Sequence, residues 1–261
     1  MTSGKAARRQ RQAVARPPVR STEGRKASPL IIFAASGVVL LIAVVILIVV
    51  LASGGSKSSA KHTAGTKLPD AGVITSQLAG IPQSGNVLGK STAPAALVEY
   101  VDLQCPVCRE FETSVMPTII KRYVRTGKLK VVARPVSIIG PDSERGRRAM
   151  IAAFAQNKGF NFSQLLYFNQ GPENSGWLDD QLVADAAASI PGLNVKQLQD
   201  AANTKAVADQ TVTFDTQAKA DGLQGTPTIL VGKTGGTLRN LGAGLPTVDS
   251  LSAQIDQALG Q

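Results

Sequence analysis

The chain of 261 residues is long enough for one or two domains, and its 43% hydrophobic and 18% charged residues are typical of a globular protein. Its formal net charge of +10 comes mainly from one end, because residues 1–28 hold eight Lys and Arg and one Glu, whereas residues 71–261 hold 17 Lys and Arg and 16 Asp and Glu. This distribution argues against nucleic-acid recognition by the folded part and is typical of a basic tail beside a membrane.

An apolar segment follows the basic tail. Residues 30–52 contain no charged side chain, and a helix of this length spans about 35 Å, against about 30 Å for the hydrocarbon core of a bilayer. The segment therefore predicts one transmembrane helix. A cleaved signal peptide is the alternative, because residues 50–52 fit a small-residue cleavage site, although the apolar region of such peptides usually has only about 7–15 residues.

The charges around this segment predict its orientation. Basic residues stay on the cytoplasmic side of a membrane, so we expect residues 1–29 to form a cytoplasmic tail and the chain after residue 52 to be extracytoplasmic. A single-pass protein of the cell membrane is thus predicted. Residues 53–72 are rich in Gly, Ser, Lys and Ala and predict a flexible linker, in which the single histidine, His62, is solvated. Residues 73–261 then form one folded domain.

The first clear strand of this domain is predicted at 95–101, a short apolar run. A helix follows at once. Pro106 suits the first helical position, where its missing N–H is harmless, and this makes Cys105 the N-cap. Pro117 is expected to kink or restart the helix, which ends at a glycine before a second strand at 128–136.

The pattern then becomes helical. From about residue 141 to 214, small and apolar residues recur with helical spacing, and Gly-Pro and Pro-Gly pairs separate the helices. Strand character returns at 228–231, and a turn at 235–236 leads into a short strand at 237–241. A final amphipathic helix is predicted at 247–259. The order strand, helix, strand, helical block, hairpin and helix predicts an α/β domain interrupted by helices.

Both cysteines of the chain lie in one motif, Cys105-Pro106-Val107-Cys108. Structural disulfides usually close long loops, because a short loop restricts the unfolded chain little. A zinc site needs about four ligands, and beyond this pair only His62 and carboxylates remain, so we predict no metal. The motif is therefore better suited to a disulfide that opens and closes.

The position of the motif predicts a different role for each sulfur. At a helix N-cap, Cys105 faces unpaired backbone N–H groups and the positive end of the helix dipole, which favour its thiolate. Cys105 is therefore predicted to be the attacking sulfur. Cys108 lies one turn further and is predicted to be the resolving thiol, which attacks a mixed disulfide on Cys105 and releases the partner protein.

These residues resemble the DsbA-like disulfide oxidoreductases of the thioredoxin superfamily. Residues 88–94, 97–100 and 104–108 are similar to their first strand and active-site helix, and residues 225–228, Gly-Thr-Pro-Thr, are similar to the loop whose proline is cis. The resemblance covers nearly all of the domain. It implies a thioredoxin-like fold with a helical domain inserted at about 141–214, here preceded by one transmembrane helix.

The resemblance also implies a substrate-binding site. It places Pro227, in the cis form, against the cysteine pair, and it implies that the backbone of Thr226 pairs with an extended substrate segment next to Pro106 and Val107. From the residues alone, a trans proline at the start of an edge strand is the commoner arrangement.

Glu99 occupies the position at which the family has a buried acid. A carboxyl group in a mostly apolar strand should have a raised pKa and can relay a proton to or from Cys108. The resemblance therefore implies a catalytic role for Glu99. The residues by themselves also fit an exposed strand face, because Asp102 follows only three positions later.

The expected function is that of an extracytoplasmic oxidase that needs no cofactor. It would donate its disulfide to exported cysteine-containing proteins and be re-oxidised by a quinone-linked membrane protein, either DsbB-like or vitamin K epoxide reductase-like. Two alternatives remain open: a membrane-anchored reductase or isomerase, and a non-enzymatic redox-sensing interaction module. The best-known oxidases have a histidine at the position of Val107, and the charge of that histidine stabilises a thiolate. Thr226 is found in oxidases, isomerases and reductases alike. Neither residue decides the direction.

Overall fold

The computed structural model describes residues 66–261. The predicted cytoplasmic tail at 1–29, the predicted transmembrane helix at 30–52 and most of the predicted linker, with His62, lie outside the described residues. Within residues 66–261, no helix is both long enough and apolar enough to cross a membrane.

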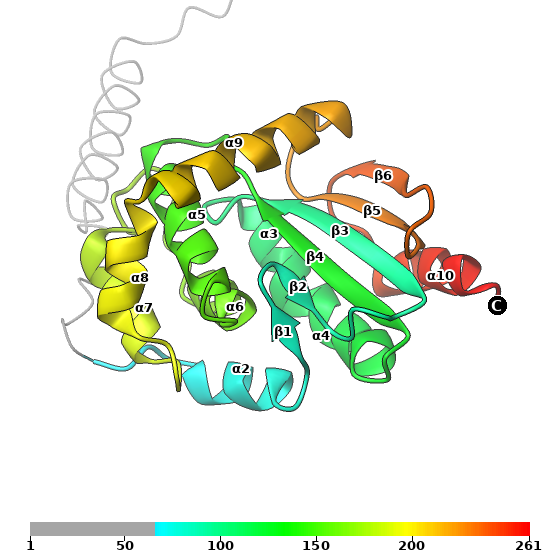
Figure 1. The fold of residues 1–261 in the computed structure, drawn as a ribbon, viewed down its shortest axis with the longest axis horizontal. Helices are drawn as coiled ribbons and strands as arrows, with labels where there is room; N and C mark the ends of the chain where they lie inside the picture. Colours follow the sequence, from blue (N-terminus) through cyan, green and yellow to red (C-terminus); the bar gives the residue numbers. More distant parts are fainter. Residues whose placement is uncertain (1–65) are drawn as a thin grey trace, which may run out of the picture. The chain divides into compact units, whose positions relative to one another are not determined.

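A mixed sheet lies at the centre of the described domain, with the strand order β1-β2-β4-β3-β5-β6 (Figure 1). The central strand β3 runs parallel to β4 and antiparallel to β5. The predicted strand at 95–101 is confirmed at both ends, and the other three predicted strands are confirmed to within two residues. The strands are β1 (Gln83–Ser84), β2 (Val87–Leu88), β3 (Ala95–Val101), β4 (Leu129–Pro135), β5 (Thr228–Lys233) and β6 (Arg239–Ala243).

A long helical segment follows β3. It consists of two α-helical stretches, each followed by a π-helical turn: α3 (Pro106–Glu110), η1 (Phe111–Val115), α4 (Met116–Ile119) and η2 (Ile120–Val124). Pro117 is the second residue of α4, which follows a π-helical turn, and the start of a helix accommodates a residue that has no N–H to donate. The break predicted at Pro117 is therefore a local change of helix type within one continuous segment.

Five helices form the predicted insertion between β4 and β5: α5 (Pro141–Phe154), α6 (Gly159–Phe168), α7 (Asp180–Ala188), α8 (Val195–Ala202) and α9 (Lys205–Ala220). Each of the last three has an N-cap residue whose side chain accepts a backbone N–H of the first turn. These N-cap residues are Asp179, Asn194 and Thr204. The insertion ends at Ala220, six residues after the predicted end at 214, because α9 continues without interruption through Phe214.

The folded domain begins earlier than residue 73, where we predict its start. α2 (Ala71–Leu78) packs against α6, and before it Leu68 is buried and donates its N–H to Ser189 Oγ at 2.8 Å. The folded domain therefore already includes Leu68, which lies within the predicted linker at 53–72. Neither α2 nor the β1–β2 hairpin is predicted, because eight helical residues and two strands of two residues each are too short to show a period.

Helices cover both faces of the sheet. The main core lies between the sheet and α3, α4, α6 and the final helix α10 (Val248–Leu259), and a smaller core lies under α9 (Figure 1). Successive residues of β3 point into these two cores in turn: Leu97 and Val101 into the main core, Val98 and Tyr100 into the smaller one. Glu99 therefore points into the main core, towards the active-site helix.

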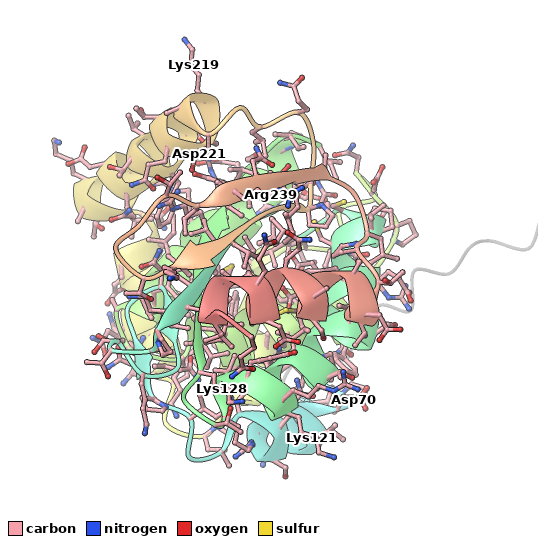
Figure 2. All side chains as sticks on the ribbon, turned by 90° about the vertical axis from the view of Figure 1, so that its right-hand side faces the viewer. Asp70, Lys121, Lys128, Lys219, Asp221 and Arg239 are labelled. Atoms are coloured by element: carbon pink, nitrogen blue, oxygen red, sulfur yellow. The ribbon has the colours of Figure 1, made fainter. Side chains whose placement is uncertain are left out.

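Charged side chains outside this interior reach into solvent. Lys219 stands out from the surface at the top of Figure 2, and Lys121, Lys128 and Lys219 are all exposed. Their arrangement contrasts with that of Glu99, which is only 2% exposed. Burying a carboxyl group costs free energy, so the position of Glu99 indicates a role other than solvation of the surface.

Candidate active site

The Cys-Pro-Val-Cys motif lies where β3 turns into α3. Cys105 is the N-cap of α3, as predicted: its sulfur accepts a hydrogen bond from the backbone N–H of Cys108 at 3.4 Å, and its carbonyl accepts one from Arg109 at 3.0 Å. Pro106 occupies the first helical position. Both cysteines are free thiols, and Cys105 is 6% exposed whereas Cys108 is 0% exposed. Only the sulfur of Cys105 is therefore within reach of another protein.

The loop before β5 lies against the cysteine pair. Its Thr226–Pro227 peptide bond is cis, which confirms the conformation predicted for Pro227. The sulfur of Cys105 lies 3.3 Å from the carbonyl oxygen of Thr226, to which it donates when protonated, and Thr228 Oγ1 closes the loop by donating to Gly225 O at 2.6 Å. Segments 121 residues apart in the sequence thus meet at the attacking sulfur.

The pKa values of the two thiols are shifted in opposite directions. The pKa of Cys105 is lowered from 9.0 to about 6, first because the Cys108 thiol donates a hydrogen bond to its sulfur. Burial opposes this effect, and hydrogen bonds from the side chain of Thr226 and from backbone N–H groups at the start of α3 assist it. Burial raises the pKa of Cys108 well above its usual value, and its contact with Cys105 raises it further. In the reduced protein, Cys105 is therefore the thiolate and Cys108 keeps its proton.

A pair of buried acids lies behind the cysteines. Glu99 is 2% exposed and Glu112 is 4% exposed, and burial raises the pKa of Glu99 well above its usual range and that of Glu112 to about 7. The two side chains hydrogen-bond to each other, which requires a proton between them, and Gln164 of α6 hydrogen-bonds to Glu112. The pair therefore retains a proton at neutral pH.

Glu112 is a residue of the site that is not predicted from the sequence. This acid follows Cys108 by four residues on one helix, a spacing that places both side chains on the same face. An acid one turn after a cysteine of the motif, on the same helix face, is the signal that would have found it. All seven residues of β3 are buried, so the solvent-facing interpretation of Glu99 is wrong.

Asp102 has a structural place in the site. Its carboxylate accepts backbone N–H groups from Gln104 at 2.9 Å and from Ile138 and Ile139 at 2.9 and 3.1 Å, which ties the turn before α3 to the loop after β4. Tyr167 of α6 donates its hydroxyl to the Asp102 carbonyl at 3.2 Å. Burial, and then the nearby negative charges, keep the pKa of Tyr167 well above its usual value, so its hydroxyl stays a donor.

Metal ligands do not gather anywhere in the described part of the chain. Residues 66–261 contain no group of three or more His, Cys, Asp or Glu side chains that could hold a metal ion. The reactive groups that the fold brings together at the motif are the two sulfurs and the pair of buried acids behind them.

The low pKa of Cys105 predicts how its reactivity depends on pH. Alkylation of the reduced protein by iodoacetamide should reach half its maximal rate near pH 6, because the reagent reacts with the thiolate. Cys105→Ser should abolish this fast phase, since Cys108 is buried and keeps its proton. Cys108→Ala should move the midpoint to higher pH, because it removes the donor that lowers the pKa most. A wild-type midpoint near 9 would contradict the assignment.

Comparison with known proteins relates this fold and motif to one family. Residues 83–257 match the family model described as thioredoxin. The chain is 29% identical over 175 residues to a probable disulfide bond formation protein D of Bacillus cereus, a match that covers 66% of this chain and 77% of the relative.

Solved structures share the fold. The chain is similar to BdbD from Bacillus subtilis in its oxidised form, with a TM-score of 0.60 and 23% identity over 69% of this chain and 98% of that one. It is also similar to DsbA of Chlamydia trachomatis, with a TM-score of 0.58 and 22% identity over 67% of this chain and 91% of the other. The thioredoxin-like fold with a helical insertion is therefore confirmed.

Proposed function

Because this chain belongs to the thioredoxin family and is a thiol–disulfide oxidoreductase, we propose that it is an extracytoplasmic oxidase that donates the Cys105–Cys108 disulfide to exported proteins. The observation that carries the proposal is the stabilised thiolate of Cys105 at the N-cap of α3. A disulfide takes electrons readily when its reduced form is stabilised, because the same stabilisation raises its reduction potential. The name of the Bacillus cereus relative, which refers to disulfide bond formation, supports the same direction.

The environments of the two sulfurs suggest the order of the steps. A substrate thiolate attacks Cys105 Sγ, a mixed disulfide forms, and Cys108 leaves as a thiolate. Because the pKa of Cys108 is high, it takes a proton, which Glu99 can supply from the pair that it forms with Glu112. A second substrate thiolate then attacks the substrate sulfur of the mixed disulfide and displaces the Cys105 thiolate. The substrate loses two electrons, which the cysteine pair gains.

Exposed apolar side chains around the motif suit an unfolded polypeptide. Val107 is 38% exposed and Ile138 is 53% exposed, and the N–H of Ile138 is bonded to Asp102 just before the motif. Leu245, 46% exposed, follows a glycine whose N–H is bonded to the carbonyl of Pro227 at 2.9 Å. We therefore assign substrate binding to Val107 with Pro106, and to the backbone of Thr226 and Pro227.

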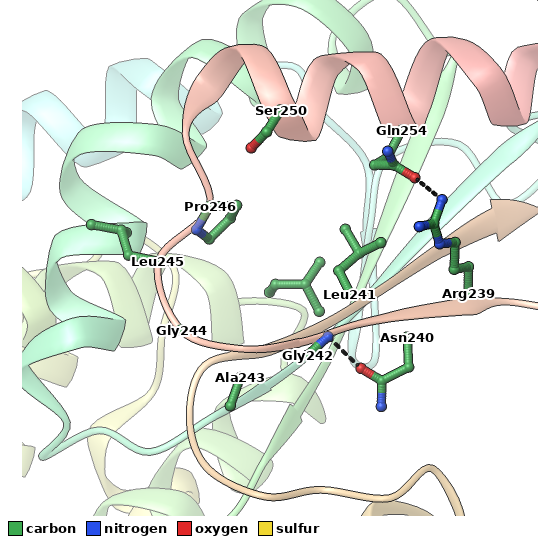
Figure 3. Close-up of a pocket in the computed structure, with 11 residues that line it drawn as sticks. Arg239, Asn240, Leu241, Gly242, Ala243, Gly244, Leu245, Pro246, Ser250 and Gln254 are labelled. Atoms are coloured by element: carbon green, nitrogen blue, oxygen red, sulfur yellow. Dashed lines mark hydrogen bonds between the residues drawn. The ribbon is translucent and has the colours of Figure 1, made fainter. Parts of the chain in front are cut away.

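A groove adjoins this surface at Leu245. It measures about 380 Å³ and lies between β6 and the start of α10, with Leu245 and Pro246 at one end and Arg239 at the other (Figure 3). Arg239 donates to Gln254 Oε1 at 3.0 Å, which links β6 to α10 across the groove. The groove could hold residues of a substrate on one side of its reacting cysteine.

The location and the redox partner are part of the proposal. The uncharged segment at 30–52 and the basic tail before it support a membrane anchor with the catalytic domain outside the cytoplasm. Each cycle leaves two electrons on the cysteine pair, so another protein must remove them. A membrane-anchored chain would meet a quinone-linked membrane partner, which is the re-oxidant that we propose.

One labelling experiment tests both location and direction. Intact cells, stripped of outer barriers, are treated with a membrane-impermeant maleimide before or after an impermeant reductant. We expect the cysteine pair to be labelled only after reduction, because an oxidase rests as its disulfide outside the membrane. Labelling without the reductant would identify a resting dithiol and favour a reductase or isomerase. Labelling only after lysis would place the domain in the cytoplasm.

A further inference from the structure

The residue before the attacking cysteine is bonded to the helical insertion. Gln104 is 0% exposed, and its side-chain amide makes three hydrogen bonds. Its Nε2 donates to Ser143 Oγ at 2.9 Å and to Asn174 Oδ1 at 3.3 Å, and its Oε1 accepts the backbone N–H of Asn174 at 2.7 Å. A buried amide that loses such partners is left with unpaired polar atoms, which costs free energy. These hydrogen bonds therefore hold Gln104 in one position relative to the helical insertion.

Asn174 adopts a conformation that residues other than glycine rarely adopt. Its φ is 51°, in the left-handed region, and its side chain also donates to Ile139 O at 3.3 Å. Gly140 leaves the space for it, because a Cβ there would lie 2.1 Å from Asn174 Oδ1. Residues held in such conformations persist only where their surroundings hold them there. The loop after β4 and Gln104 together hold Asn174 in place.

The same loop of the insertion also holds the two neighbours of Gln104. Gln170, which follows α6, donates from Nε2 to Leu103 O at 2.8 Å and to Cys105 O at 3.2 Å. Three consecutive residues of the turn before α3 are thus fixed by residues 170–174. The position of this turn decides whether Cys105 Sγ meets the N–H of Cys108, at 3.4 Å in this structure.

We propose that Gln104 and Asn174 are positioning residues, a latch by which the helical insertion holds the sulfur of Cys105 at the N-terminus of the active-site helix. The inference rests on the proposed function only in taking Cys105 as the attacking sulfur. Opening the latch frees the turn before α3, so the sulfur meets the backbone N–H groups of the helix less often. The thiolate then loses stabilisation, although neither latch residue touches the sulfur.

Two variants of the full-length chain test the latch. Asn174→Gly keeps the left-handed backbone and the N–H bonded to Gln104 but removes the side-chain amide. Gln104→Met keeps the side-chain length and removes all three hydrogen bonds. The measurement is the ultraviolet absorbance of the Cys105 thiolate against pH. We expect its midpoint to rise by about half a unit in the first variant and about one unit in the second, a roughly three- and tenfold loss of thiolate below the midpoint.

Asn157 supplies a matched control. It is also left-handed, with a φ of 55°, and its Oδ1 accepts the N–H of Gly85 at 3.0 Å in the turn between β1 and β2. Asn157→Gly removes one side-chain hydrogen bond from the same backbone conformation and should leave the thiolate titration unchanged. A wild-type midpoint in both latch variants, whatever the change in their denaturation midpoints, would overturn the proposal.

The outcome separates the latch from the proposed function. If the wild-type protein fails to oxidise a reduced substrate protein while the latch variants still shift the thiolate titration, the latch stands and the oxidase does not. If Gln104→Met does not fold, Asn174→Gly decides alone, because its side chain lies in a surface loop and its backbone conformation suits glycine.

Discussion

Replacing Cys108 by serine is expected to stop the reaction after its first covalent step. The serine hydroxyl can still donate a hydrogen bond to Cys105, so the Cys105 thiolate should remain reactive towards disulfides in exported proteins. The mixed disulfide that forms has no resolving thiol. Covalent complexes should accumulate and run as high-mass bands on non-reducing gels, and turnover should fall to the uncatalysed rate.

An aromatic disulfide reagent makes the same prediction quantitative. The reduced wild-type protein should release two thiol equivalents from 5,5′-dithiobis(2-nitrobenzoate), because Cys108 displaces the second from the Cys105 adduct. Cys108→Ser should release one equivalent and keep the adduct. Cys105→Ser should react slowly, since Cys108 is 0% exposed and protonated. Complexes trapped by Cys105→Ser and not by Cys108→Ser would reverse the two roles.

The central parts of the site could be predicted because they depend on local sequence. Pro106 fixes the first turn of a helix, and the helix start then makes Cys105 an N-cap with a stabilised thiolate. The apolar run at 95–101 is short and buried on both faces, so its ends are sharp. The cis form of Pro227 is different, because local physics favours trans and only the resemblance to a family indicated it.

Contacts between distant segments could not be predicted. Gln164 reaches Glu112 from the insertion, and Asn174 reaches Gln104 across 70 residues of sequence. Each of these residues is polar, and from the sequence alone each would be predicted to lie on the solvent-exposed surface. The burial of Gln104, Glu112 and Gln164 follows from how α6 and its following loop pack beside α3, which neither periodicity nor motif spacing describes.

Glu99→Gln should slow the enzyme by roughly 10²-fold, the contribution typical of a general acid–base catalyst. The substitution keeps the shape of the side chain but removes its exchangeable proton. The expected loss falls on the step in which Cys108 changes its protonation, because the high pKa of Cys108 makes its thiolate a poor leaving group without a proton donor. Glu112 remains in the variant, and burial keeps its pKa raised, but the amide at position 99 can no longer pass a proton from the pair to Cys108.

The same substitution should change how stability depends on pH. A buried acid whose folded pKa is raised contributes stability that is complete below its unfolded pKa, about 4.5, and is lost as the pH rises through the folded value. The wild-type protein should therefore lose stability as the pH rises above about 4.5 and through about 7, the pKa of Glu112. Glu99→Gln should lose less over this range. The oxidised protein is the form to melt, because its cysteines do not titrate.

Stopped-flow oxidation of a dithiol peptide across pH, beside denaturant melts of the oxidised protein, tests both expectations. Glu110→Gln is the matched control, since Glu110 is an exposed acid on the active-site helix and should change neither rate nor pH dependence. A slow Glu99→Gln variant with a wild-type pH profile would mean that Glu99 supports the fold around Cys108 without supplying its proton. Unchanged rates at every pH would remove Glu99 from the mechanism and leave Glu112, the acid one turn after Cys108, as the group to replace next.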